Sequence, residues 1–155
     1  MSSFRIIQLS SEPIEEEDHI TDCNICEDAL FLMESDWGGK TLEYGEVIDD
    51  IAEDLKEVAD IDKEKRTLTF KDKDTIKEIL REHVRKCCDR FMERTEEGRW
   101  STSETNLRHE IAEPCGIRHH FHTGYCQKAS TVLADYIAGF NPQTMYIGGI
   151  LYAHC

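Results

Sequence analysis

Two cysteines and three histidines lie within twelve residues near the end of the chain: Cys115, His119, His120, His122 and Cys126. The order Cys115-x3-His119-x2-His122-x3-Cys126 offers two sulfur and two nitrogen ligands, the donor set that suits tetrahedral Zn²⁺. The segment lacks the close Cys-x2-Cys pair of most structural zinc sites. These four residues are a candidate zinc site, and surface or hydrogen-bonded histidines are the alternative.

The other cysteines point mainly to reduced thiols. Cys23-x2-Cys26 has the close spacing and could complete a zinc site from a distance, but the apolar residues after Cys26 favour a packed thiol. Cys87 and Cys88 fall in an apolar helical stripe and are expected to be buried. Seven cysteines form an odd number, and the chain starts without a signal-peptide pattern. We therefore expect a cytoplasmic protein without a disulfide framework.

Cys126 is also a candidate nucleophile. It falls at the start of a predicted helix over 125–140, where the helix dipole and unpaired amides would lower the pKa of a thiol. Either His122 or His154 could serve as the base. The alternative function that follows is a thiol enzyme.

The residues Gly124-Tyr125-Cys126, the small Ala129 and a later strand ending at His154 resemble the core of transglutaminase-like and papain-like cysteine enzymes, over about thirty residues. The resemblance implies a cysteine hydrolase or acyltransferase. In those families the residue that orients the histidine follows it in the chain. Here only Cys155 follows His154, so a third member of the triad would have to come from upstream.

A predicted helix over 46–60 carries a second chemical feature, a row of carboxylates opposite its apolar stripe. Several of these are like-charged neighbours at i,i+4, and each such exposed pair costs about 0.2–0.5 kcal/mol. A positive surface opposite them would relieve that cost. The candidate partner-binding residues are Glu46, Asp49, Asp50, Glu53, Asp54 and Glu57.

Two sources of positive charge are open. The internal one is a helix predicted over 75–94, whose outward residues are Lys77, Arg81, Arg85, Lys86, Arg90 and Arg94. The external one is the basic surface of a partner protein. The whole chain has a net charge of −14, and residues 1–62 hold 19 acidic but only 3 basic side chains. Pairing within the chain therefore leaves a surplus of acidic side chains. This charge makes bare nucleic acid and anionic membranes poor partners.

The preferred hypothesis is a non-enzymatic intracellular interaction protein. Its acidic part would occupy a basic nucleic-acid-binding surface, such as that of a nucleic-acid-processing enzyme, as small acidic inhibitors from phages and mobile elements do. The alternatives are the thiol enzyme and a zinc-stabilised regulatory module. Apart from zinc, no cofactor is expected, and the oligomeric state is not predicted.

The elements that must position these residues follow from hydrophobic spacing. A chain of 155 residues has the size of one domain, here with an acidic part over 1–62, a basic-faced helix over 74–94 and a cysteine- and histidine-rich part over 115–155. The predicted strands are 4–9, 66–70 and 145–153, with a strand or loop over 117–122. The predicted helices are 46–60, 75–94, 103–112 and 125–140, with helical turns over 26–33. The fold class is therefore α+β, a single domain with a small, mostly antiparallel sheet packed with two main amphipathic helices, 75–94 and 125–140. No segment is long and apolar enough to span a membrane.

Overall fold

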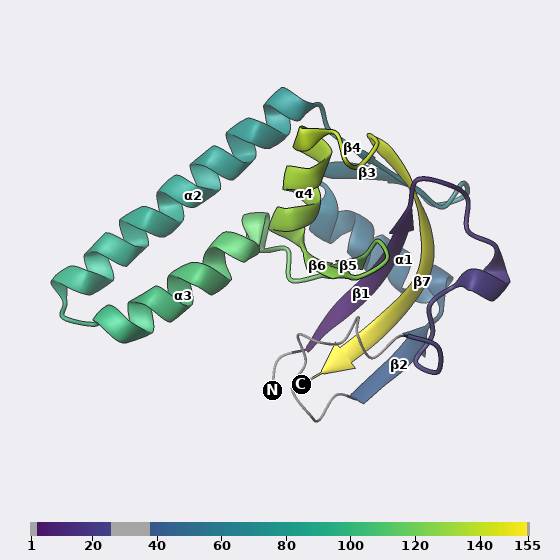
Figure 1. Cartoon of the computed structure of the whole chain (residues 1–155), viewed down its shortest axis with the longest axis horizontal. Coiled ribbons are helices and arrows are strands. Elements are labelled where there is room, and N and C mark those ends of the chain that lie inside the picture. Colours follow the sequence, from purple (N-terminus) through teal and green to yellow (C-terminus); the bar gives the residue numbers. More distant parts are fainter. Residues whose placement is uncertain (1–2, 26–37, 155) are drawn as a thin grey trace.

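The computed structural model describes residues 3–25 and 38–154, which form one sheet and four α-helices (Figure 1). The strands are β1 (Ser3–Ser10), β2 (Gly38–Leu42), β3 (Ala59–Asp62), β4 (Thr67–Phe70), β5 (His120–His122), β6 (Cys126–Lys128) and β7 (Thr144–His154). The helices are α1 (Tyr44–Leu55), α2 (Lys73–Glu96), α3 (Trp100–Ala112) and α4 (Ala129–Ala138), with short 3-10 turns η1 (Glu16–Asp18) and η3 (Pro114–Gly116). The predicted α+β class is confirmed.

Strand β7 organises the sheet. Along one edge it pairs with β1, and along the other it pairs with β4 near its start and with β2 near its end, all antiparallel. The strand order is β3-β4-β7-β1-β5-β6, and the pairing of β1 with β5 is parallel. The mostly antiparallel sheet predicted from the sequence is therefore confirmed.

Alternation along the strands gives the sheet two buried faces. Ile7 lies beside Phe121 of β5 and Ile150 of β7, and these side chains join the main core with apolar residues of α1, α4 and the first turns of α2. Ile6 and Leu151 point the other way, into a smaller cluster that Ile20 covers. The large core thus lies between the sheet and its helices.

Gln8 fastens the segment that covers the smaller cluster. Its side-chain oxygen accepts hydrogen bonds from the N–H of Ile20 (2.9 Å) and the N–H of Gly149 (2.8 Å), while its amide donates to the carbonyl oxygen of Asp18 (3.0 Å). One partly buried side chain therefore links β1, β7 and the segment that crosses them.

Several predicted helix boundaries differ from those in the structure. α1 ends at Leu55 instead of residue 60, because Ala59 already pairs with Phe70 in the β3–β4 hairpin. α4 begins at Ala129 instead of residue 125, because residues 126–128 pair with β5 as strand β6. The cap of α2 is Asp72, whose carboxylate accepts a hydrogen bond from the N–H of Thr75 (2.9 Å). The predicted turns over 26–33 lie outside the described residues.

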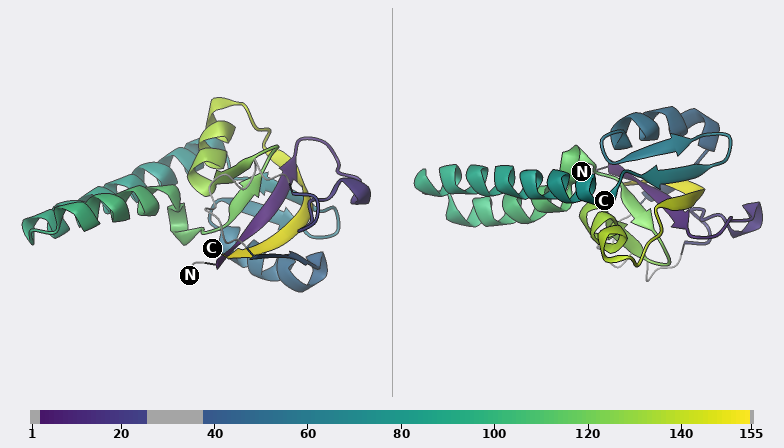
Figure 2. Two further views of the ribbon diagram at one scale, coloured as in Figure 1. Left: turned by 60° about the horizontal axis from the view of Figure 1, so that its bottom comes forward. Right: turned by 90° about the horizontal axis from the view of Figure 1, so that it is seen from above.

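Helices α2 and α3 form an antiparallel hairpin that projects from the rest of the molecule (Figure 2). We refer to residues 73–112 as the arm. Near its base, the arm contacts α4 and η3. None of the described helices combines the length and the apolar content needed to cross a membrane.

Candidate partner-binding face and the cysteine and histidine segment

Helix α1 presents its carboxylates outward because its apolar side chains are buried in the main core. Val47, Ile48, Ile51 and Leu55 are buried against the sheet. The six predicted partner-binding residues occupy the remaining positions, with the last of them just beyond the helix. We call this set, Glu46, Asp49, Asp50, Glu53, Asp54 and Glu57, the acidic face.

Bases from neighbouring segments pair with part of the acidic face. Arg5 of β1 reaches Asp50 (3.1 Å) and Asp54 (3.8 Å), and Lys63 pairs with Asp49. The carboxylate side chains of Asp49 and Asp50 nevertheless remain 74% and 69% exposed. Such exposed pairs contribute little to stability, so the carboxylates stay available to a stronger partner.

The basic side chains of α2 do not neutralise the acidic face. Arg81 pairs with Glu78 within α2, and Arg85 and Lys86 both reach Glu82. Arg90 and Arg94 pair with Glu110 of α3 at 3.1 and 2.8 Å. Within the described residues, no ion pair joins α2 to the acidic face. The hypothesis that the basic residues of α2 neutralise the acidic face within the fold is therefore wrong.

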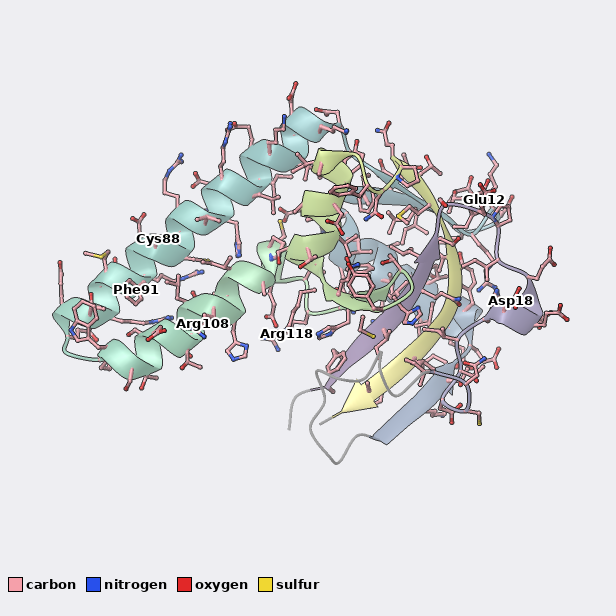
Figure 3. All side chains as sticks on the ribbon, in the orientation of Figure 1. Glu12, Asp18, Cys88, Phe91, Arg108 and Arg118 are labelled. Atoms are coloured by element: carbon pink, nitrogen blue, oxygen red, sulfur yellow. The ribbon has the colours of Figure 1, made fainter. Side chains whose placement is uncertain are left out.

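A second group of acids lies around η1. Glu12 and Asp18 mark its two ends on the side of the molecule away from the arm (Figure 3). Glu15, Glu16 and Glu17 fall between them and are exposed. This group offers the same charge in a different place and therefore provides a matched control for the acidic face.

His119 and Cys115 both lie against the acidic face. The Nε2 atom of His119 is 2.8 Å from a carboxylate oxygen of Asp54. Burial lowers the pKa of this imidazole, an effect that outweighs the opposing pull of the carboxylate. Partial burial, together with a hydrogen bond to Glu57, raises the pKa of the Cys115 thiol to about 11. Both residues therefore belong to the surroundings of α1.

His122 and Cys126 lie elsewhere in the sheet. They are opposite each other in the β5–β6 hairpin, on the face shared by Gln8, which is the neighbour of His122 in β1. The four predicted zinc ligands are thus divided between two places. Among the described residues, no three histidine, cysteine or acidic side chains gather as a metal site. The structure therefore does not bring together the predicted zinc ligands Cys115, His119, His122 and Cys126, because His119 turns toward α1.

Cys126 does not occupy the helix start that was predicted to activate it. It begins strand β6, and α4 starts three residues later. Burial raises the pKa of its thiol to about 11, opposite to the change that a nucleophile needs. Burial also lowers the pKa of His122. The thiol of Cys126 therefore has the surroundings of a packed side chain, next to the smaller core cluster.

His154 is far from Cys126 across the sheet. It ends β7, opposite Ser3 of β1 and Gly38 of β2. Strands β1 and β5 separate β7 from β6, which corresponds to about 14 Å at the usual spacing of neighbouring strands. His122 is therefore the nearer of the two bases considered for the thiol enzyme.

Thiol labelling tests the nucleophile directly. At pH 8 a raised pKa of about 11 leaves about a hundredfold less thiolate on Cys126 than the ordinary value of 9.0 would. We expect iodoacetamide to modify exposed Cys88 well before Cys126, as measured by mass spectrometry of peptides. Preferential labelling of Cys126 at pH 6 would instead support the thiol enzyme.

Some positions were missed because they depend on contacts far apart in the chain. Arg5 contacts Asp50 of α1, which lies 45 residues away in the chain, and no local sequence pattern predicts that contact. Cys87 is buried as predicted, whereas Cys88 is exposed, so that prediction is half wrong. The low apolar content of the segment over 73–112 was a usable signal that the arm would project.

Comparisons with family models, curated proteins and solved structures found no match to this chain.

Proposed function

We propose that this chain is a non-enzymatic protein that binds a basic, nucleic-acid-binding surface of a partner protein through the acidic face of α1. The observation that carries the proposal is that the carboxylates of the acidic face remain exposed and that few bases within the described residues pair with them. Long-range attraction to a basic partner would make association fast and sensitive to salt.

The density of charge along α1 supports competition with nucleic acid. Glu46, Asp49, Asp50, Glu53 and Asp54 fall within nine residues, a rise of about 12 Å along the helix axis, or about one carboxylate per 3 Å. A strand of DNA presents one phosphate per about 3.4 Å of axis, and a duplex one per about 1.7 Å. A surface that binds phosphates would therefore meet a comparable row of negative charge.

The destination of the α2 bases also supports the proposal. Had they paired with α1, the acidic face would be part of an internal network. They pair instead with acids of α2 and α3, such as Glu82 and Glu110. Only Arg5, Lys56, Lys63 and the buried His119 pair with the acidic face within the described residues. A surplus of negative charge is left for a partner.

The test begins with the immobilised chain, which captures proteins from source cells at 50 mM NaCl. We expect a basic nucleic-acid-binding protein that duplex DNA displaces and whose binding weakens at least about tenfold at 300 mM NaCl. The affinity of the purified pair is then measured by calorimetry. A captured partner that is not basic, or binding that ignores salt, contradicts the proposal.

Two variants with equal change in charge locate the binding surface. The first carries Glu46→Gln, Asp49→Asn, Glu53→Gln and Glu57→Gln, and it keeps Asp50 and Asp54 because they hold Arg5 and His119. The second carries Glu12→Gln, Glu15→Gln, Glu16→Gln and Glu17→Gln. We expect about a tenfold or larger loss of affinity for the first variant and much less for the second. Equal losses would show that net charge alone matters and would reject the acidic face.

A further inference from the structure

The arm reaches well beyond the body that supports it. α2 has 24 residues, which correspond to about 36 Å of helix, and its first turns join α4 in the main core through Ile76, Ile79 and Leu80. Both views in Figure 2 show the outer part of α2 and α3 extending away from the sheet. The outer arm therefore lies apart from the core of the molecule.

Polar contacts hold the two helices of the arm together. Glu110 of α3 receives Arg90 and Arg94 of α2, and its carbonyl oxygen lies 2.6 Å from Nε2 of His83. In the outer arm the buried residues are Cys87, Thr95 and Ser103. Of the larger apolar side chains in the outer part of the arm, Phe91 and Trp100 meet across the two helices, whereas Val84 and Met92 remain exposed.

Those apolar side chains gather on one side of the arm. Val84, Cys88, Phe91 and Met92 recur at i, i+4, i+7 and i+8, the spacing of a single helix face. Trp100 extends this face to α3, because its ring meets that of Phe91 edge-on at 6.1 Å. Figure 3 marks Cys88 and Phe91 in the outer half of α2. We call these five residues the arm patch.

Four of the five residues of the arm patch are exposed to solvent, and Phe91 is half-buried. The exposed fractions are 40% for Val84, 56% for Met92 and 65% for Trp100. Contiguous apolar surface of this kind commonly marks an interface. Helix α3 has only 13 residues, a length at which an isolated helix is marginal in water, so a covering partner would also stabilise the arm.

Charge points to a second copy of this chain as the occupant. Residues 73–112 hold nine basic and nine acidic side chains, whereas the rest of the chain holds nine basic and 23 acidic ones. Two bodies of such negative charge repel each other, but two arms carry no net charge. Antiparallel packing of the arms would also place the bodies at opposite ends.

We infer that two copies of this chain pair through their arm patches to form an antiparallel four-helix assembly with twofold symmetry. At about 10 Å of width per helix, α3 and the part of α2 from Val84 onward would cover about 400 Å² per copy. A standard interface covers about 800 Å² per partner, so the dimer belongs at the weak end of specific interfaces. It dissociates in the micromolar range. This inference is independent of the proposed partner of α1.

Sedimentation of the full chain between about 1 and 200 µM tests the dimer. The expected mass rises from 17.9 kDa toward twice that value over this range. A double variant with Met92→Glu and Trp100→Glu remains monomeric at 200 µM. The control Phe140→Glu, which alters an aromatic residue outside the arm that is 80% exposed, dimerises as the parent does. A parent that stays monomeric at 200 µM overturns the inference, as does equal loss in both variants.

Protection of a thiol in the unmodified protein locates the contact without relying on a variant that must fold. Cys88 lies in the arm patch, and exposed Cys23 lies outside the arm. Iodoacetamide labelling of Cys88 is expected to slow at least about threefold between 2 and 200 µM protein, while labelling of Cys23 is unchanged. A dimer that leaves Cys88 equally reactive overturns the arm as its interface.

Discussion

Replacing Gly149 with alanine is expected to lower the free energy of unfolding by about 3 kcal/mol or more. A β-carbon at this position would lie 2.2 Å from the carbonyl oxygen of Ile20 and 2.8 Å from its nitrogen. These are backbone atoms, and the Ile20 N–H is held by Gln8. Relief of the clash therefore requires the segment over Ile6 and Leu151 to move away from the sheet.

Two further glycine variants separate this effect from a general cost of alanine. At Gly148 the nearest atoms are side-chain atoms of Gln8 and Ile14, at 2.3 to 2.8 Å, so Gly148→Ala should cost less. Gly45 lies in α1 with nothing within 4 Å, so Gly45→Ala should stabilise the protein by about 0.5–1 kcal/mol. Urea unfolding measures all three. Wild-type stability of Gly149→Ala would contradict the close approach of Ile20.

Acid is expected to destabilise the protein from about pH 6.5 downward, mainly through His120. This imidazole is 8% exposed and its ring centre is 4.2 Å from that of Phe4. Burial, together with the positive charge of Lys128, lowers the pKa of His120 from 6.5 to about 4. The unfolded chain therefore binds a proton at higher pH than the folded chain does. Stability is complete above pH 6.5 and falls as the pH decreases toward 4, by up to about 3 kcal/mol.

A phenylalanine at position 120 keeps an aromatic ring beside Phe4 and removes the titrating group. We expect His120→Phe to flatten the profile of unfolding free energy between pH 7 and 4.5, as measured by urea unfolding at each pH. The slope should not vanish, because burial also lowers the pKa values of His119 and His122. The variant His109→Gln, at an exposed position, is the control for replacing a histidine as such. An unaltered slope in His120→Phe would contradict the burial of a neutral imidazole.

The elements that the sequence predicted well are those whose residues carry the pattern themselves. Apolar spacing located α1 and the long strands β1 and β7, because each buries one face or both faces over many residues. It also located α2, although the outer half of the apolar stripe of α2 is exposed. The errors occur where a distant partner decides. Residues 126–128 directly precede helix α4 but pair with β5 as strand β6. Residue 59 was predicted to be helical but pairs with Phe70 in the β3–β4 hairpin. A single-sequence pattern does not contain those pairings.

The candidate sites divide in the same way. The carboxylates of α1 were predictable, since their outward position follows from the apolar stripe opposite. The directions of the histidines were not, because His119 and His120 are adjacent in sequence yet meet α1 and Phe4 respectively. The arm patch was hidden as well. Its spacing is that of an ordinary core-facing stripe, and only the placement of α3 leaves it uncovered.

The central place of β7 also has a consequence for how the chain folds. β1 begins to pair with β7 at Ser3 and His154, so this contact closes a loop of nearly the entire sequence. Closure over such a separation is slow, whereas the helices of the arm need only local contacts. On a ribosome, the arm can therefore form early. The sheet must wait for residues 144–154, and until they are made, β1, β2 and β4 lack their common partner and remain open to aggregation.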